Sequence, residues 1–337
     1  MLSISNLSYF IGGRPLYENA NLHIKPKDKI GLVGQNGTGK STLLKIINGD
    51  YQPSSGEVQK AKDCTIGFLN QDLLSYQSDD SILNVALAAF KETLALQDEI
   101  DEVLKKMETD YSEEIINRLA FLQDRFEANE GYTIKAKAEE VLEGIGFKSA
   151  DLEKPLRTFS GGWRMRVMLA KLLLEKPSLL MLDEPTNHLD LPSIEWVENY
   201  MKNYEGAVIV VSHDQTFLDN CISSTVEVAS NTLTLYSGNY SFYKEEKKER
   251  MEIQQNAYEN QQQMIKQTEK FIERFRAKAT KSNQVQSRIK ALDRMDRVHE
   301  VVSDEVSVNF KFKFSKQSGR DVVILDNISK AYGDNVI

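Results

Sequence analysis

The pattern of hydrophobic and polar positions predicts a mixed α/β domain over residues 1–240. Apolar runs at residues 30–33, 178–182 and 207–211 are short and bounded by glycine or serine, which is typical of buried strands. Between residues 71 and 160 the apolar spacing changes to three and four, as at Ile82, Val85 and Ala89. This spacing predicts helices, so we expect a helical subdomain of about residues 78–175 inserted in the α/β domain.

Residues 241–300 carry the pattern of a long helical hairpin. Over residues 243–298 the chain is rich in Glu, Lys, Gln and Arg and has almost no Gly or Pro. Met251, Tyr258, Ile265 and Ile272 repeat every seven positions, which is typical of a coiled coil. We expect two antiparallel helices joined by a short tip. The first, at about 35 residues and 1.5 Å per residue, reaches about 50 Å and extends beyond a compact domain.

Residues 301–337 combine a strand pattern with an internal repeat. Apolar and polar residues alternate over 306–314, which predicts a strand. Residues 325–333 match residues 4–12 in register, with Asn327 on Asn6 and Gly333 on Gly12. Two strands alone leave unpaired edges. We therefore expect a second domain of the same kind to begin here, in a fragment of a longer tandem protein; a vestigial tail is the alternative.

Composition limits the class of protein. The chain is 41% hydrophobic and 27% charged with a net charge of −8, as in an ordinary globular protein that does not bind nucleic acid over its whole surface. The sequence contains no run of eighteen apolar residues, so it predicts no membrane span. Residues 1–8 lack the features of a signal peptide. Cys64 and Cys221 fit no metal spacing. We expect a cytoplasmic protein with reduced thiols.

A glycine-rich stretch at residues 34–41 reads G-x-x-x-x-G-K-S, directly after a predicted strand and before a helical run. Its glycines permit consecutive N–H groups to point into one concavity, and the helix N-terminus adds partial positive charge. We expect Lys40 to pair with the β- and γ-phosphates of ATP and Ser41 to ligate Mg²⁺. A plain tight turn is the alternative. The expected ATP-binding residues are Gly34, Gln35, Asn36, Gly37, Thr38, Gly39, Lys40, Ser41 and Thr42.

Two carboxylates, Asp183 and Glu184, end the apolar strand at 178–182. Burying them is unfavourable unless they meet a cation or a substrate. We expect Asp183 to hold Mg²⁺ and Glu184 to orient or deprotonate the attacking water. A pair of helix N-caps is the alternative, although Pro185 makes a turn there. His213 follows the next strand, and ligands gather at the carboxyl ends of such strands, so we expect it to contact the γ-phosphate.

Two further motifs complete a family pattern. Ser160-Gly161-Gly162 opens a helix, and residues 182–190 read L-D-E-P-T-N-H-L-D. Both motifs resemble those of the ATP-binding cassette superfamily, and their particular residues resemble those of its ABC-F branch. The charged helical pair, with its segments 271–281 and 286–288, is similar to the ABC-F interdomain linker. The resemblance implies an α/β P-loop NTPase cassette, with a mixed sheet core and an inserted helical subdomain, followed by a long α-helical hairpin linker.

The resemblance also assigns roles that the residues alone do not. It implies that Gln71 lies near Mg²⁺ and the attacking water, and that Asp190 lies in a D-loop that crosses a cassette interface. It implies that Ser160, Gly161 and Gly162 form a signature that clamps the γ-phosphate of the opposing cassette; a helix start offers N–H groups to an anion. ATP hydrolysis to ADP and phosphate then takes place in a composite site that needs a second cassette.

The sequence departs from the superfamily pattern at two positions. Trp163 stands after the signature glycines where many cassettes have Gln. Ile11 stands where an aromatic residue usually stacks on adenine, while the repeat has Tyr332 there. Tyr9 and Phe10 are close, but strand alternation turns one of them into the core. We therefore expect loose nucleotide selectivity.

The predicted tip of the hairpin is basic. Between residues 270 and 290 there are seven Lys or Arg residues and one acid, Glu273. A solvated helix surface is one interpretation, and a contact with phosphate-rich RNA is the other. The candidates for RNA contact are Arg274, Arg276, Lys278, Lys281 and Arg288.

The resemblance implies a ribosome-bound factor whose linker extends from the tRNA exit site towards peptidyl-tRNA. The expected partners are the ribosome with its tRNA and the second cassette of the full-length chain, and the fragment can self-associate. The pattern does not distinguish regulation of translation from protection or rescue of ribosomes. Two other functions stay open: the ATPase subunit of a membrane transporter, which the absent membrane span disfavours, and an RNA-binding scaffold that uses ATP as a clamp.

Overall fold

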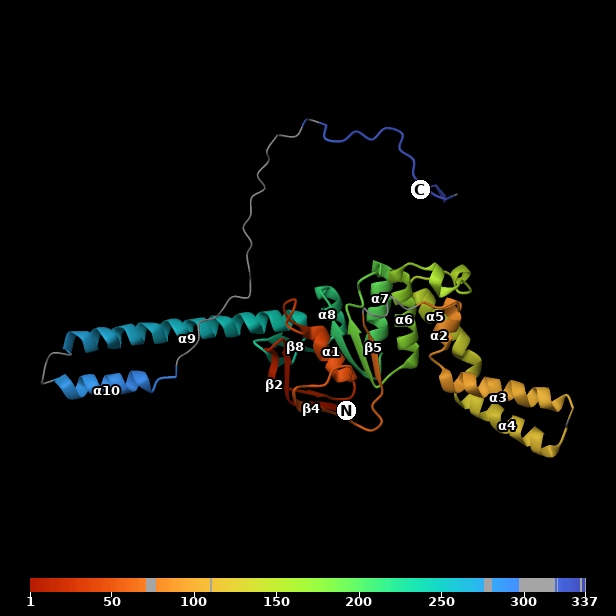
Figure 1. Ribbon diagram of the computed structural model, residues 1–337, viewed down its shortest axis with the longest axis horizontal. Coiled ribbons are helices and arrows are strands. Elements are labelled where there is room, and N and C mark those ends of the chain that lie inside the picture. Colours follow the sequence, from red (N-terminus) through yellow and green to blue (C-terminus); the bar gives the residue numbers. More distant parts are fainter. Residues whose placement is uncertain are drawn as a thin grey trace. The chain divides into compact units, whose positions relative to one another are not determined.

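The computed structural model describes residues 1–70, 77–109, 111–275, 281–296, 319, 321–333 and 335–336 (Figure 1). The chain divides into two compact units, Met1–Arg250 and Met251–Ile337, and each is described by itself. The elements of the first unit are β1 (Leu2–Ile11), β2 (Arg14–Ile24), β3 (Lys29–Val33), α1 (Lys40–Asn48), β4 (Ser55–Lys60), β5 (Ile66–Leu69), α2 (Ile82–Leu87), α3 (Lys91–Met107), α4 (Glu113–Ala128), α5 (Ile134–Gly144), α6 (Gly161–Glu175), β6 (Leu179–Asp183), α7 (Leu191–Lys202), β7 (Ala207–Val211), α8 (Gln215–Cys221), β8 (Ser224–Ala229), β9 (Thr232–Tyr236) and the start of α9 (Tyr240–Phe275).

A six-stranded sheet in the order β5-β6-β7-β3-β8-β9 forms the centre of the first unit. All of its strands are parallel except β9, which runs antiparallel to β8. The three apolar runs of the sequence become β3, β6 and β7, so these strand predictions are confirmed to within one residue at each end. Because β7 lies between β6 and β3, the carboxyl ends of these three strands meet at one edge of the sheet.

Both faces of this sheet are buried at its central strands, such as β6 and β7. Along β6, Leu179 and Met181 point into a core shared with α1 and with a three-stranded antiparallel sheet in the order β2-β1-β4. Leu180 and Leu182 point into a second core, which is shared with α2, α5, α6, α7 and α8. A strand between two cores has no polar face, which is why the run at 178–182 shows no alternation.

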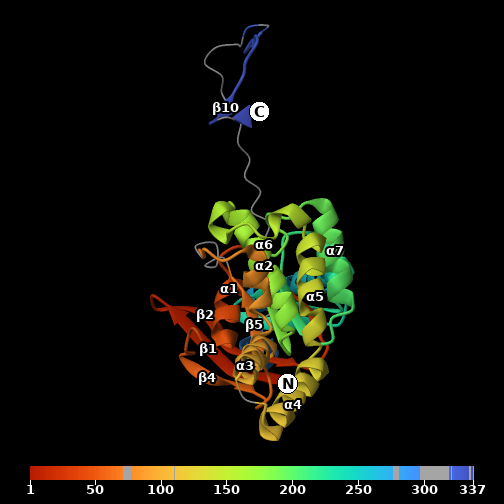
Figure 2. The same cartoon turned by 90° about the vertical axis from the view of Figure 1, so that its right-hand side faces the viewer.

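The inserted helical subdomain contains a hairpin of two helices, α3 and α4, which lie side by side (Figures 1 and 2). They enclose a small apolar cluster of their own, made by Leu96, Ile100, Leu122 and Phe126. The periodicity predicts these helices because their buried residues recur at three- and four-residue spacings. The mixed sheet with its inserted helices confirms the predicted cassette fold.

The second unit contains the rest of α9, then α10 (Ser282–Asp293), β10 (Ala331–Tyr332) and β11 (Asn335–Val336). Two contacts join the helices in antiparallel order: Gln261 donates to the Asp296 carbonyl at 2.8 Å, and the Arg288 guanidinium lies 4.1 Å from the Phe271 ring centre. The predicted helical region after the cassette is confirmed. The strand predicted at 306–314 lies outside the described residues. Within the described residues, no helix is long and apolar enough to cross a membrane.

The internal repeat extends to the backbone. Asn6 and Asn327 share a left-handed φ of 48°, and Gly12 and Gly333 have φ of 57° and 61°. The pair Tyr332↔Asn335 of β10 and β11 has the same register as Ile11↔Arg14 of β1 and β2. The two segments therefore form the same hairpin, while the second domain that the repeat implies stays a prediction.

Candidate nucleotide site

The glycine-rich loop joins the end of β3 to the start of α1. Gly39 is the N-cap of α1 with a left-handed φ of 101°, and Gly37 has φ of 83°. A Cβ built on Gly39 lies 2.6 Å from the Leu16 side chain, so only glycine fits both the backbone angle and the space. The loop therefore takes its shape from glycine, and it presents the N-terminus of α1 to an anion.

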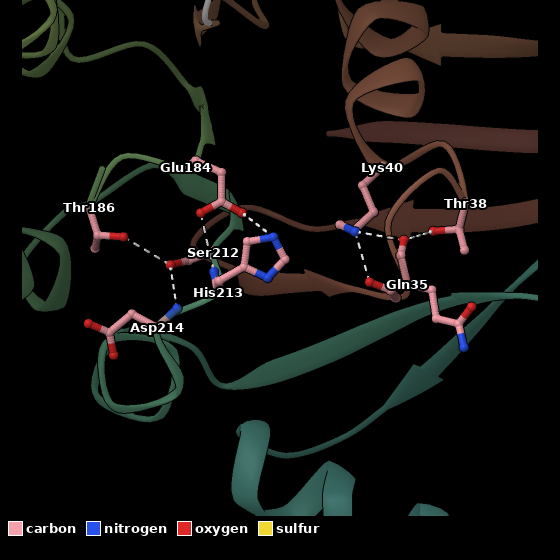
Figure 3. A network of polar contacts seen from close by, with 9 residues as sticks. Gln35, Thr38, Lys40, Glu184, Thr186, Ser212, His213 and Asp214 are labelled. Atoms are coloured by element: carbon pink, nitrogen blue, oxygen red, sulfur yellow. Dashed lines mark hydrogen bonds and ion pairs between the residues drawn. The ribbon is translucent and has the colours of Figure 1, made fainter. Parts of the chain in front are cut away.

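Lys40 lies within the curve of this loop. Its ammonium group donates to the carbonyl oxygens of Gly34 at 2.8 Å and Gln35 at 2.9 Å, and the Thr38 hydroxyl donates to the same Gln35 oxygen (Figure 3). Burial lowers the pKa of Lys40, while the nearby carboxylates of Glu184 and Asp183 act in the opposite direction. A half-buried ammonium group whose acceptors among the described residues are carbonyl oxygens gains from negatively charged acceptors, which phosphate oxygens provide.

Asp183 and Glu184 stand at the end of β6. Asp183 is buried. The Glu184 backbone has a left-handed φ of 53°, and its N–H donates to the Val211 carbonyl at 2.9 Å, which stabilises this conformation. Glu184 meets His213 twice: the His213 N–H donates to Oε2 at 3.2 Å, and Nε2 lies 3.4 Å from Oε1 (Figure 3). Burial raises the pKa of Glu184, opposed by His213 and Lys40. A carboxylate held in a strained backbone beside an imidazole is typical of a functional site.

Two hydroxyl groups lie next in sequence to the Glu184–His213 pair or close to it and help to fix its backbone. The hydroxyls of Thr186 and Ser212 lie 3.2 Å apart, and Ser212 accepts the Asp214 N–H at 3.0 Å. Asp214 then caps α8 by accepting the Phe217 N–H at 3.1 Å. These supporting residues were not predicted from the sequence, although Asp214 could have been found as an N-cap before a helical run.

The loop and the strand ends enclose one cavity of about 350 Å³. It is lined by Ile11, Leu16, Asn36, Gly37, Gly39, Lys40, Ser41, Thr42, Asp183, Glu184, Val211 and His213. The structure thus brings together, in one cavity, site residues that were predicted separately in three segments of the sequence. Gly34, Gln35 and Thr38 belong to the same loop but are not among the residues that line the cavity. Leu16 was missed because its place depends on how β2 lies against the loop.

The oxygen atoms of the cavity that could bind Mg²⁺ fit this ion when a phosphate supplies further ligands. The Ser41 hydroxyl and the Asp183 carboxylate line the same cavity, and Mg²⁺ prefers few protein oxygens and keeps the rest of its shell for water and substrate phosphates. Within the residues described, no cluster of three or more His, Cys, Asp or Glu side chains forms a metal cage of its own.

At the mouth of the cavity, one of the two aromatic residues before Ile11 turns towards the core, as expected. Tyr9 packs against the core and stacks on Tyr51 with ring centres 6.2 Å apart. Phe10 and Ile11, although consecutive, are both exposed, at 46% and 55%. The β1–β2 register shifts between Tyr9 and Phe10, and this irregularity interrupts simple alternation. Ile11 lies at the cavity, as the repeat alignment places it.

The signature residues lie elsewhere in the first unit. Ser160 is the N-cap of α6, and Asp190 is the N-cap of α7. The buried Arg166 guanidinium joins these helices: it donates to the His188 carbonyl at 2.8 Å and to the Asp190 carboxylate at 3.3 Å. Neither the signature, residues 160–162, nor Asp190 is among the residues that line the nucleotide cavity. The chain therefore carries two separate candidate surfaces.

Several predicted residues lie outside the cassette or outside the described residues. Gln71, Arg276 and Lys278 belong to the segments that are not described. Arg274 lies in the last turn of α9, and Lys281 precedes α10, where it donates to Gln284 at 3.1 Å. Arg288 lies on α10 over Phe271, as described above.

The fold and the site together define a P-loop nucleotide-binding cassette. A family model described as ABC transporter matches residues 17–187, and a second model with the same description matches residues 226–312. The chain belongs to the ATP-binding cassette family and is of its ABC-F type. Cassettes of this family bind ATP.

Curated relatives cover nearly the whole chain. An uncharacterised ABC transporter ATP-binding protein, YfmM of Bacillus subtilis, is 36% identical over 95% of this chain and 62% of its own length. The probable ATP-binding protein YheS of Haemophilus influenzae is 35% identical over 99% and 51%. ABC transporter F family member 5 of Arabidopsis thaliana is 33% identical over 100% and 49%. The chain thus spans about half to three fifths of the length of these relatives.

Proposed function

We propose that this chain binds ATP with Mg²⁺ and supplies the hydrolytic half of an ATPase site. The observation that carries the proposal is the single cavity in which the glycine-rich loop, Lys40, Asp183, Glu184 and His213 meet. The loop would hold the phosphates with its backbone N–H groups, and Lys40 would exchange its two carbonyl acceptors for phosphate oxygens.

Hydrolysis then follows from the charges at the end of β6. Glu184 orients the attacking water in line with the γ-phosphate and accepts its proton, which the raised pKa of this carboxyl favours. His213, held 3.4 Å from Glu184, contacts the γ-phosphate on the same side. Ser41 and Asp183 would hold Mg²⁺, which would supply positive charge to offset the charge that develops during transfer.

A complete site needs a second cassette in this proposal. The signature at residues 160–162 opens α6 and is not among the residues that line the cavity, which favours a role in a site other than the one in its own cassette. The greater length of the relatives, and the hairpin that residues 325–336 repeat, both favour a second cassette in the full-length protein.

We further propose that the full-length protein is cytoplasmic and acts on the ribosome at the tRNA exit site. The support is the excess of seven basic residues over one acid between residues 270 and 290, in a chain whose net charge is −8. Contacts of this kind fit the RNA backbone rather than particular bases. The ABC-F type of the chain favours the same partner.

The experiment is sedimentation of the full-length protein carrying Glu184→Gln with ribosomes, with and without ATP. This variant retains ATP, so we expect ATP to increase the ribosome-bound fraction several-fold. A bound fraction that ATP does not change would end the assignment to translation. Co-purification with an integral membrane protein instead would favour a transporter subunit.

A further inference from the structure

Tyr17 of β2 makes an unusual contact with the glycine-rich loop. Its side chain is fully buried, and its hydroxyl group donates to the Gly39 carbonyl oxygen at 2.9 Å. Burial also raises the pKa of this hydroxyl, so it is a neutral donor at physiological pH. The contact joins the antiparallel sheet to the residue directly before Lys40.

The position of the Gly39 oxygen determines where the next N–H group points. No peptide bond among the described residues is cis, and in a trans peptide the carbonyl of one residue and the N–H of the next point in opposite directions. The Gly39 oxygen is held towards β2 by Tyr17. The N–H of Lys40 therefore points away from the Tyr17 hydroxyl that holds the Gly39 oxygen.

The first turn of α1 does not provide the same restraint. The Gly39 oxygen also accepts the Leu43 N–H at 2.8 Å, but that bond lies within α1 and moves with it. Among the described residues, the Tyr17 hydroxyl is the side-chain group that hydrogen-bonds this peptide to the sheet. The fit is close, because a Cβ on Gly39 would lie 2.6 Å from Leu16 and 3.1 Å from the Tyr17 oxygen.

We propose that Tyr17 is a positioning residue for phosphate binding, which acts through the Gly39–Lys40 peptide. This inference rests on the proposed nucleotide function and adds a residue to its site. The hydroxyl sets the orientation of the Lys40 N–H before a phosphate arrives, so the ligand does not have to order this peptide itself. Preorganisation of this kind strengthens binding by reducing the entropy lost on association.

A role in core packing alone would make a different prediction. Tyr17→Phe keeps the ring and removes one oxygen, and the Gly39 carbonyl remains paired with Leu43. The matched control is Tyr200→Phe, since the Tyr200 hydroxyl donates to the Leu173 carbonyl at 2.8 Å and does not line the nucleotide cavity. Both variants lose one tyrosine hydroxyl and one hydrogen bond to a backbone oxygen, from a fully buried ring at Tyr17 and a half-buried ring at Tyr200.

The test is titration of the parent chain and both variants with MgATP and MgADP, well below their unfolding temperatures. We expect Tyr17→Phe to raise both dissociation constants about five-fold, the effect of one ordinary hydrogen bond, and Tyr200→Phe to leave them unchanged. The loss applies to ADP because the loop N–H groups hold the phosphates that ADP retains.

Two results would overturn the inference: Tyr17→Phe binding like the parent, or both variants weakening binding equally, which would indicate a general loss of stability. A parent chain that binds neither nucleotide would instead remove the proposed function itself. The unfolding temperature of each variant, measured in parallel, separates these cases because a positioning role changes affinity more than stability.

Discussion

At the scale of single residues, the loop after β6 stores backbone strain beside the reacting position. Glu184 and His188 both have left-handed φ angles, 53° and 79°, which non-glycine residues rarely adopt. The Val211 carbonyl and the two His213 contacts hold Glu184 in place. Such strain persists where the surroundings determine the conformation, and here it directs a buried carboxylate into the nucleotide cavity.

Glu184→Gln keeps the shape of this side chain and removes its basicity. We expect the affinity for MgATP to stay within about two-fold and turnover to fall by about 10²–10⁴, the usual contribution of a general base. Phosphate release from the full-length protein measures turnover. Glu205→Gln, an exposed carboxyl just before β7 and outside this cavity, is the control and should turn over like the parent. Parent-like turnover by Glu184→Gln would remove Glu184 from the mechanism.

The same substitution predicts a change in stability with pH. The pKa of Glu184 is raised by burial, so its contribution to stability is fully present below the ordinary pKa of a glutamate and is lost as the pH rises through the folded-state value. Gln resembles the neutral form at every pH. Glu184→Gln should therefore unfold at a higher temperature than the parent at pH 7.5, with the difference shrinking towards pH 4.5. A difference that grows on acidification would contradict the direction of the shift.

At the scale of elements, a buried carboxylate anchors the start of α9 to the cassette. Glu227 of β8 accepts hydrogen bonds from Tyr236 at 3.1 Å, Tyr243 at 2.9 Å and Lys247 at 2.6 Å. Arg250 lies 4.8 Å from the Tyr236 ring centre. Burial and this carboxylate raise the pKa of Tyr236 to about 12, so it remains a neutral donor. Glu227 also pairs in the sheet with Val33, the last residue of β3.

Removing the cation from this cluster should loosen the start of α9. Lys247→Met leaves the buried Glu227 with hydroxyl donors only, and we expect the free energy of unfolding to fall by about 1–3 kcal/mol. Lys244→Met changes an exposed lysine of the same helix and should cost less than about 0.5 kcal/mol. Denaturant unfolding of the chain measures both. Equal effects of the two substitutions would show that the Glu227–Lys247 pair does not anchor the helix.

The elements that the sequence predicted well are those whose pattern is local. The strand at 207–211 agrees with β7 at both ends, and the expected helix of about 35 residues is α9 with 36. The first compact unit ends at Arg250, and in it Tyr243 and Lys247 of α9 bind Glu227 across the fold. Tertiary contacts of this kind leave no periodic signal along the chain.

The residues of the candidate site also fall into two groups, those that a local motif predicts and those that contacts with distant segments place there. Residues 34–42 could be assigned because the loop chemistry requires them next to one another in sequence. Leu16 and Tyr17 contact that loop through the register of β2, which no short motif encodes. Ser212 supports His213 through a hydroxyl contact with Thr186, which belongs to another strand end. These residues were missed because their roles depend on distant parts of the chain.

At the scale of the whole molecule, the nucleotide cavity and the signature residues lie on separate surfaces of one cassette, and the proposed function assigns them to different ATPase sites. The cavity holds the glycine-rich loop and Glu184, and the start of α6 holds the signature. The hairpin of β10 and β11 repeats the register of β1 and β2, which fits the start of a second cassette in the full-length protein.

Mixing two inactive variants of the chain tests this division. Lys40→Met damages the loop, and Gly161→Asp places a carboxylate at the helix start that would bind a phosphate. Each variant alone should be inactive. If copies pair with one intact site in each mixed pair, equal mixing should restore about a quarter of the parent rate at the same concentration. No recovery on mixing, or full activity of Gly161→Asp alone, would contradict a shared site.

The most direct test of the central claim is an equilibrium titration of the chain with MgATP. We expect saturable binding of one nucleotide per chain, retained in Glu184→Gln and weakened at least about ten-fold in Lys40→Met, because a charge-assisted contact to phosphate is lost. The absence of saturable binding by the parent, or equal affinity of the parent and Lys40→Met, would contradict it.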